Sequence, residues 1–283
     1  MAEIENIILD KDTRNISKLK KYIDKDFVNK SAEFLLESKG NIFITTGFYI
    51  VYAGATETDG PPGSVALGNA LKKLGFSVTY ITDKWSYDVV KSILQDEDEL
   101  IEFPITSHIE SLEFGNKLIK DFSPELLISI ERAGLMNDGT YRNWKNEDIS
   151  EFNAKIDHLF EQFPKSIGIG DGGNEIGMGN LYNGIIETSG LPDNPSITTV
   201  SNLIISSCSN WGAYGLIAAI SKLIGENLLP SVDLSKEYIM KLVDSGAVEG
   251  MSGKKYYGVD GRNLDDDSSC LQRLHDHLKN HGL

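Results

Sequence analysis

A glycine-rich stretch that follows a short apolar run holds the residues of this sequence best suited to chemistry. Residues 168–179 contain six glycines, the carboxylates Asp171 and Glu175, and the carboxamide of Asn174. Glycine at this density weakens regular structure by roughly 0.5–1 kcal/mol per position, so such a loop usually serves a left-handed backbone or close approach to a ligand. A plain surface turn would leave both acids without a reason. We therefore interpret the stretch as part of a site.

Charged and amide residues follow three more predicted strands, at residues 57–59, 131–132 and 209–211. Ligands of open α/β sheets bind beyond the carboxyl ends of the strands, where such loops meet. Any one of these residues alone is more commonly a solvated loop charge or a helix cap, but four loops at one edge favour a site. The predicted catalytic residues are the charged ones, which are Glu57, Asp59, Glu131, Arg132, Asp171 and Glu175.

Three of these carboxylates also suit a metal ion. Glu57, Asp59 and Asp171 would offer hard oxygen ligands, which Mg²⁺ and Mn²⁺ prefer and Zn²⁺ does not. Their spacing matches no known metal-binding loop. The sequence therefore predicts no certain cofactor and leaves a divalent cation, Mg²⁺ or Mn²⁺, as an open alternative.

Standard nucleotide and nucleophile motifs do not account for the site. Residues 168–173 match the dinucleotide fingerprint, but Asp171 would face the pyrophosphate with like charge. Residues 253–255 resemble the end of a P-loop, yet Val248 stands where a glycine is required and the last position is not Ser or Thr. No serine or cysteine has the context of a nucleophile elbow. We predict neither a nucleotide cofactor nor a catalytic triad.

The elements that must position this site alternate along the chain. Apolar runs predict strands at 41–46, 76–82, 100–103, 126–130, 166–169 and 202–206, and helical spacing predicts helices at 16–38, 61–74, 86–94, 109–122, 152–163, 209–224 and 236–244. The alternation predicts an α/β fold with a doubly wound, mainly parallel sheet and helices on both faces, in three α/β/α layers. With no linker or repeat, we expect one domain over residues 1–283. An N-terminal helical segment (1–39) and a C-terminal one (232–283) should belong to it.

Charge and composition limit the partners. The chain has 283 residues and a formal net charge of −15; an acidic surface repels phosphate backbones, so nucleic acid is not expected. No apolar run reaches the ~20 residues of a membrane span, and the acidic start lacks a secretory leader. Two cysteines fit a reducing compartment. We expect a cytoplasmic protein that binds a small anionic amino acid, not a membrane, with a homo-oligomer left open.

Several motifs occur together and in order. They are Thr46-Gly47-Phe48, Glu57 to Gly63, Glu131-Arg132-Ala133-Gly134, Asp138-Gly139 with Tyr141, Asp157 with Leu159-Phe160, Ile167 to Gly179, Ser209 to Gly212, Gly246-Ala247-Val248 and Val259-Asp260-Gly261. Together they resemble the D-glutamate cyclase-like C-terminal domain family, which stands alone in bacteria and is fused to a lyase-like domain in animals. Two departures are Glu249, where the family typically has Asp, and Leu135-Met136 in place of a more polar pair.

The resemblance implies a hydro-lyase that converts D-glutamate to 5-oxo-D-proline and water, by attack of the α-amine on the γ-carboxyl carbon. Glu57 or Asp171 would then be the general base, and Arg132 or a bound cation would neutralise the γ-carboxylate. N–H groups of the glycine-rich loop would stabilise the oxyanion, and Lys254 or its neighbour Lys255 would hold the α-carboxylate. The residues expected to bind substrate are Thr46, Gly47, Gly172, Gly173, Asn174, Asn210 and Lys254.

Two other functions stay open. The first is a non-catalytic module of the same family that binds a small ligand or a metal. The second is a divalent-metal-dependent enzyme that acts on another small anionic substrate.

Overall fold

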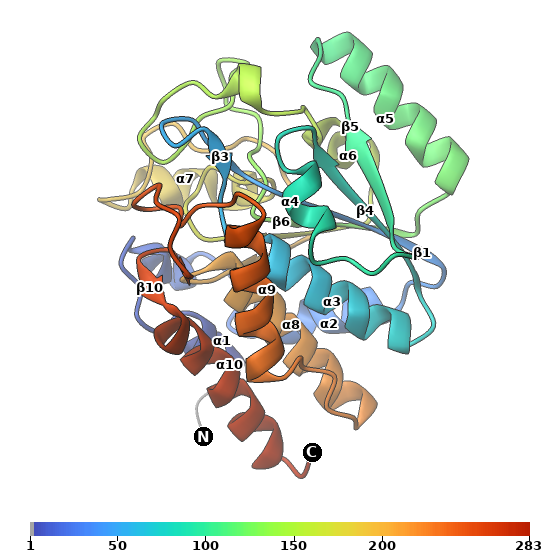
Figure 1. Ribbon diagram of the computed structural model, residues 1–283, viewed down its shortest axis with the longest axis vertical. Coiled ribbons are helices and arrows are strands. Elements are labelled where there is room, and N and C mark those ends of the chain that lie inside the picture. The colour runs from blue at the N-terminus through green and yellow to red at the C-terminus, as the bar shows by residue number, and fades with distance from the viewer. Residues whose placement is uncertain (1–2) are drawn as a thin grey trace.

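A six-stranded parallel sheet forms the centre of the protein (Figure 1). The structure is a computed structural model that describes residues 3–283. Across the sheet the strands follow the order β5-β4-β1-β6-β7-β8, and all adjacent pairs are parallel. This order is that of a doubly wound sheet, so the predicted three-layer α/β fold is confirmed. The strands are β1 (Asn41–Thr46), β4 (Ser77–Asp83), β5 (Glu99–Phe103), β6 (Leu126–Ile130), β7 (Ser166–Gly170) and β8 (Asn202–Ile205).

One face of the sheet is covered by helices grouped around α8 (Ser209–Ile224). This helix contacts α3 (Pro61–Lys73), α2 (Phe27–Leu36), α1 (Ile4–Ile8) and α10 (Leu264–Lys279). Its central turns are buried because its sequence is apolar on all sides, as expected for a helix enclosed by others. The N-terminal and C-terminal segments thus meet on the same helix.

The other face carries α5 (His108–Phe122) and α6 (Asp157–Gln162), which contact each other. Successive side chains of a strand point to opposite faces, so β1 places Ile42 and Ile44 in the first core and Phe43 in the second. α5 begins with a capping box formed by Ser107 and Glu110. The remaining α-helices and short strands are β2 (Tyr49–Ile50), β3 (Ala55–Thr56), α4 (Tyr87–Lys91), α7 (Tyr182–Ile186), α9 (Val232–Asp244), β9 (Gly258–Val259) and β10 (Arg262–Asn263), and a short 3-10 helix, Met178–Leu181, precedes α7.

Two predicted helices are interrupted. The region predicted as 16–38 forms a 3-10 helix, Ile16–Lys21, before α2, and the region predicted as 152–163 contains another, Ser150–Phe152, before α6. The apolar positions of both regions are largely buried, as expected. The helical spacing thus predicted correctly which residues are buried, but it did not predict that each helix is interrupted. None of the helices in residues 3–283 is long and apolar enough to cross a membrane.

The sheet has its topological switch point between β1 and β6. The chain leaves β1 for α3 on one face and leaves β6 for α6 on the other, so the loops after these two strands diverge. A crevice opens at such a point beyond the carboxyl ends of the strands. The fold therefore directs the residues after β1 and β6 to one place, with those after β7 and β8 beside them.

Candidate active site

Buried carboxylates gather at this switch point around a small cavity. Each of them is at most 7% exposed, and they come from the loops after β1, β6 and β7 and from the C-terminal segment; they are Glu57, Asp59, Glu131, Asp171 and Asp260. The cavity of about 20 Å³ is lined by Arg14, Phe48, Ile50, Glu57, Glu131, Trp144, Asn174, Gly250 and Met251. That volume admits about one water molecule. The structure is thus closed around its acidic centre.

Among the residues that the structure describes, Glu57 and Glu131 are the two carboxylic acids that line the cavity. Burial, then the charges of Asp260 and Asp59, raise the pKa of Glu57 well above its usual range. Burial, then the charge of Glu175, does the same to the pKa of Glu131. Buried acids under each other's charge resist ionising together, so these two carboxyl groups keep a proton to a higher pH than glutamic acids in water do.

The backbone at Glu131, beside the cavity, has a strained conformation. Glu131 has a φ of 49°, in the left-handed region that residues other than glycine seldom adopt. Gly60 makes room for it, since a Cβ on Gly60 would lie 2.7 Å from the Glu131 Cβ. The hydroxyl of Ser209 donates to Glu131 Oε2 at 2.6 Å and fixes the carboxyl group. Strain of this kind is commonly found at functional sites.

Asp59 acts as a tertiary cap for helix α8. Its carboxylate accepts the N–H groups of Ser209 at 2.7 Å and Asn210 at 2.8 Å, and the thiol of Cys208 at 3.2 Å. Burial and the charge of Asp260 raise the pKa of Asp59 to about 6, while the two N–H groups act in the opposite direction. Negative charge is favoured at a helix N-terminus. Asp59 therefore binds the loop after β1 to the start of α8.

Glu175 organises the glycine-rich loop. Its carboxylate accepts the N–H groups of Asp171 at 2.9 Å, Gly172 at 2.5 Å and Gly173 at 2.7 Å. The two glycine N–H groups that we predicted would stabilise an oxyanion thus already have a carboxylate acceptor. In this structure Glu175 positions Asp171, and does not line the cavity.

The cation of the site is Arg14, which no motif of the sequence indicates. Its guanidinium forms ion pairs with Asp171 and, at 2.8 Å from Nη2, with Asp260 Oδ1. Arg14 lies between α1 and the 3-10 helix Ile16–Lys21. In the sequence it is far from the glycine-rich loop and from the other motifs that predicted the site. Burial raises the pKa of Asp171 well above its usual range although Arg14 lowers it. Sequence offered one signal for Asp260, its place in Val259-Asp260-Gly261, and none for Arg14.

Arg132 lies elsewhere. Its buried guanidinium donates to Asp83 Oδ2 at 2.5 Å, to the carbonyl oxygen of Gly47 at 2.7 Å and to that of Ala154 at 3.0 Å. Three partners in the protein interior hold its two terminal nitrogens, while its Nε is buried without a hydrogen-bond partner, and the group does not line the cavity. The structure thus places the predicted cation of the site in an internal ion pair between β4 and β6.

The other predicted binding residues are divided between the cavity and its support. Asn174 lines the cavity and donates to the carbonyl oxygen of Arg142. Asn210 accepts the N–H groups of Gly60 and Gly63, so it supports the loop after β1. Thr46 is buried beside Gly60 with no partner for its hydroxyl, and Lys254 lies exposed on the loop before β9. The structure does not bring Lys254 to the acids.

Within residues 3–283, two groups of three buried residues could hold a metal ion. Ligand atoms of Asp59, Glu131 and Asp171 lie within 4.8 Å of one another, and so do those of Asp59, Cys208 and Asp260. Of the three predicted metal ligands, Asp59 and Asp171 fall in the first group, whereas Glu57 falls in neither. Asp171 Oδ2 and Asp260 Oδ2 are buried without a hydrogen-bond partner, which leaves each group one free oxygen for an ion or a proton.

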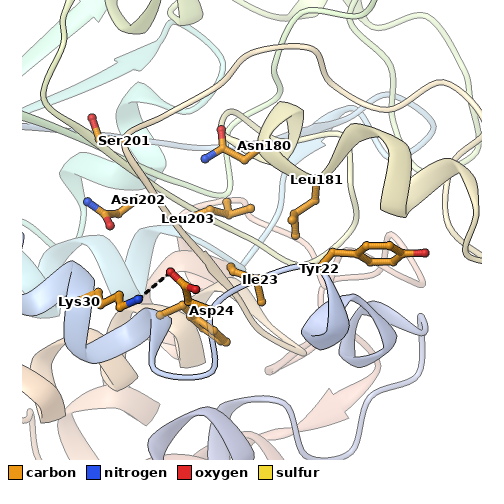
Figure 2. A pocket seen from close by; sticks show the side chains of 10 residues that line it. Tyr22, Ile23, Asp24, Lys30, Asn180, Leu181, Ser201, Asn202 and Leu203 are labelled. Carbon is orange, nitrogen blue, oxygen red and sulfur yellow. Dashed lines mark hydrogen bonds and ion pairs between the residues drawn. The ribbon is translucent and has the colours of Figure 1, made fainter.

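A larger hollow elsewhere lacks such chemistry. A cavity of about 280 Å³ lies beside the start of β8 and is lined by residues of the segment before α2 (Figure 2). The charged side chains drawn there, Asp24 and Lys30, form an ion pair at 2.7 Å with each other. The candidate active site is therefore identified by its cluster of buried carboxylates and not by the volume of its cavity.

The comparison with known proteins agrees with the motifs. The family described as "D-glutamate cyclase-like, C-terminal" matches residues 4–275. This chain belongs to that family. Within it, the chain is 31% identical over 270 residues to the mitochondrial D-glutamate cyclase of Homo sapiens, with 88% of this chain and 42% of that protein covered. The family member described here thus spans less than half the length of that relative.

This family member also has a slight likeness to a solved structure. An exopolyphosphatase-related protein from Bacteroides fragilis has a TM-score of 0.44 and 13% sequence identity, over 93% of this chain and 58% of that one. A likeness this slight carries no conclusion about fold or activity.

Proposed function

We propose that this protein is a D-glutamate cyclase, a hydro-lyase that converts D-glutamate to 5-oxo-D-proline and water. The observation that supports it is the pair Glu57 and Glu131, two buried carboxylic acids that face one cavity in a member of this family. Proton transfer between a positioned acid and a positioned base is what this reaction requires.

The reaction moves protons from the α-nitrogen of the substrate to a γ-carboxyl oxygen of the same molecule. The C–N bond forms when the α-amine attacks the γ-carboxyl carbon, and a C–O bond breaks to release water. The nitrogen loses two protons as it changes from an ammonium to an amide, and the departing oxygen gains two. The site therefore needs a base near the nitrogen and an acid near the oxygen, and no net proton from solvent.

Glu57 and Glu131 suit these two roles. In a pair that holds one proton, the ionised member accepts a proton from the ammonium and the protonated member donates one to the departing oxygen. The proton then passes from the first acid to the second, and a second round of the same transfers moves the other proton, so two protons leave the nitrogen and two reach the oxygen. The glutamate chain must also fold so that the amine reaches its own carboxyl carbon, a step that a small enclosed site favours. The cavity as it stands holds about one water molecule, so the substrate enters only when its cover, which includes Met251, moves aside. Phe48 and Ile50 then supply the apolar wall against which the methylene groups would lie.

A bound divalent cation is a second way to neutralise the negative charge of the buried carboxylates. Mg²⁺ or Mn²⁺ bound by Asp59, Glu131 and Asp171 would polarise the γ-carboxylate as a Lewis acid. The free, buried Asp171 Oδ2 favours this candidate. The donor set consists of oxygen atoms, which fits these two ions.

One assay tests the activity and the cation together. The purified chain, stripped of metal, is incubated with D-glutamate and separately with L-glutamate, with and without Mn²⁺ or Mg²⁺, and chiral chromatography quantifies 5-oxoproline. We expect 5-oxo-D-proline from D-glutamate. A folded protein that forms none above the uncatalysed rate in any condition refutes the proposal.

The competing function is a module that binds a small anion or a metal without chemistry. Binding of D-glutamate with no turnover would favour that module.

Two buried free cysteines, Cys208 and Cys270, fit a reducing compartment such as the cytoplasm for either function.

A further inference from the structure

Arg14 is held in the acidic site by its own segment of chain, residues 9–15. Asp12 accepts the N–H of Arg14 at 2.9 Å and the hydroxyl of Ser17 at 2.6 Å. Arg262 donates to the carbonyl oxygen of Lys11 at 3.1 Å and also to that of Asp260 at 3.3 Å. The segment is therefore fastened to the loop that carries Asp260, and Arg14 is a fixed part of the site.

The guanidinium of Arg14 has donors to spare. A guanidinium carries five N–H groups, and its contacts in residues 3–283 are with Asp171, Asp260 and the sulfur of Met251 at 3.6 Å. Two N–H groups thus have no partner, and a third faces a thioether, which is a weak acceptor. A carboxylate is a much stronger acceptor for such groups.

Arg14 is also the one cation among the described residues that line the cavity. Arg132 is enclosed by Asp83 and two carbonyl oxygens, and Lys254 lies exposed on its loop. An amino acid with two carboxylates would meet mainly negative charge in this cavity unless Arg14 received one of them. Its ammonium, by contrast, would face Glu57 and Glu131.

We propose that Arg14 is the residue that binds a carboxylate of the dicarboxylic amino acid, and thereby selects this class of substrate. This inference rests on the proposed function. Met251, which is 37% exposed, covers the guanidinium in the closed structure. Its side chain moves aside when the substrate carboxylate takes its place against Arg14.

The test uses glutarate, a five-carbon dicarboxylate that has no amine and cannot cyclise. Binding of glutarate is measured by calorimetry for the wild-type chain, Arg14→Gln, Arg14→Lys and Arg273→Gln. The last is a matched control, because Arg273 pairs with Asp10 of the same segment outside the cavity. We expect Arg14→Gln to weaken binding at least tenfold, Arg14→Lys to weaken it less, and Arg273→Gln to leave it unchanged.

Kinetics with D-glutamate give the second measurement. Loss of a substrate contact raises KM, so Arg14→Gln should raise KM at least tenfold, whereas a merely structural role would lower the folded fraction and leave KM unchanged. If Arg14→Gln fails to fold, Arg14→Lys keeps the charge and decides the question. Glutarate binding that is absent from the wild-type chain, or equal in wild type and a folded Arg14 variant, overturns the inference. Arg14-dependent glutarate binding without 5-oxoproline would refute the cyclase instead.

Discussion

Arg14 and Asp171, which lie 157 residues apart in the chain, form an ion pair beside the acidic cavity. The pair joins the segment that precedes the fold's first strand to the glycine-rich loop after β7. A buried carboxylate without a cation nearby is strongly disfavoured. The N-terminal segment is thus a component of the site, and Asp260 from the C-terminal segment completes the same contact.

Removing either acid that lines the cavity should suppress turnover. Glu57→Gln and Glu131→Gln are each expected to lower kcat about 10²–10⁴-fold, because an amide can neither accept nor donate the required proton. Turnover is followed as 5-oxoproline formation, with thermal unfolding as a check on the fold. Glu113→Gln, an exposed change on α5, is the control. Full activity in both cavity variants would show that this pair is not the acid–base couple.

The activity of the wild-type chain should fall as pH rises. Burial and neighbouring charges raise the pKa of both Glu57 and Glu131, so the pair keeps a proton above the usual range of a glutamic acid. As pH rises through this raised pKa the acid member ionises and the rate declines. A profile of kcat against pH, measured over a range in which the fold is intact, tests this. A rate that only increases with pH is the contrary result.

Gly250 should be required for the position of Glu57. A Cβ added to Gly250 would lie 2.0 Å from Glu57 Oε2. Gly250→Ala therefore displaces the carboxyl group, and we expect kcat to fall at least about tenfold while the fold persists. Gly115→Ala is the matched control, since the one tight contact of its new Cβ would be with the flexible end of Leu159 at 3.2 Å. Equal activity of the two variants would contradict the proposed role of Glu57.

Glu175 should contribute to stability through the loop it organises. Glu175→Gln replaces a charged acceptor of three N–H groups by an amide with one acceptor oxygen, so a donor is left unpaired in the interior. We expect a loss of about 1–3 kcal/mol in the free energy of unfolding, measured by urea denaturation. Glu187→Gln alters a solvent-exposed hydrogen bond to Tyr22 and should change stability by at most about 0.5 kcal/mol. The expectation fails if both variants unfold alike.

Arg132 should behave as a structural residue. Arg132→Gln leaves Asp83 as an unpaired buried carboxylate, and breaking such a pair costs about 3–5 kcal/mol. The exposed pair of Lys241 with Glu237 on α9 gives the comparison, with an expected loss of about 0.3–0.5 kcal/mol for Lys241→Gln. Urea denaturation measures both. A KM for D-glutamate that rises strongly in a stable Arg132→Gln variant would restore the substrate-binding role that we predicted from the sequence.

Asp157 should make the fold less stable as pH rises. Burial raises the pKa of Asp157 from 3.8 to about 6, although Tyr141 donates a hydrogen bond to it. The folded state therefore binds the proton more tightly than the unfolded state, and this stability is present below pH 4 and lost as pH rises to about 6. The loss amounts to roughly 3 kcal/mol at 1.36 kcal/mol per pKa unit. Asp157→Asn should flatten that part of the stability profile, whereas the exposed change Asp233→Asn should not.

The sequence by itself determined the sheet and the acidic loops that follow its strands. Apolar runs such as Leu126–Ile130 are local signals, and the strand observed there has the predicted bounds. Parallel strands have their carboxyl ends at the same edge of a sheet. The loops that carry Glu57, Glu131 and Asp171 each follow such a strand, so they were expected at that edge. That reasoning needs only the order of elements along the chain.

Only the tertiary structure decided which charges face each other. Arg14 and Arg132 are both arginines next to polar residues, yet Arg14 enters the acidic cluster and Arg132 pairs with Asp83. Likewise, Glu175 and Asp171 stand four residues apart, but Glu175 accepts the loop N–H groups and leaves Asp171 for the cation. A charged side chain can reach many partners, and the choice depends on which of them packing brings within a few ångströms in a medium of low dielectric constant. No local pattern in the sequence encodes that choice.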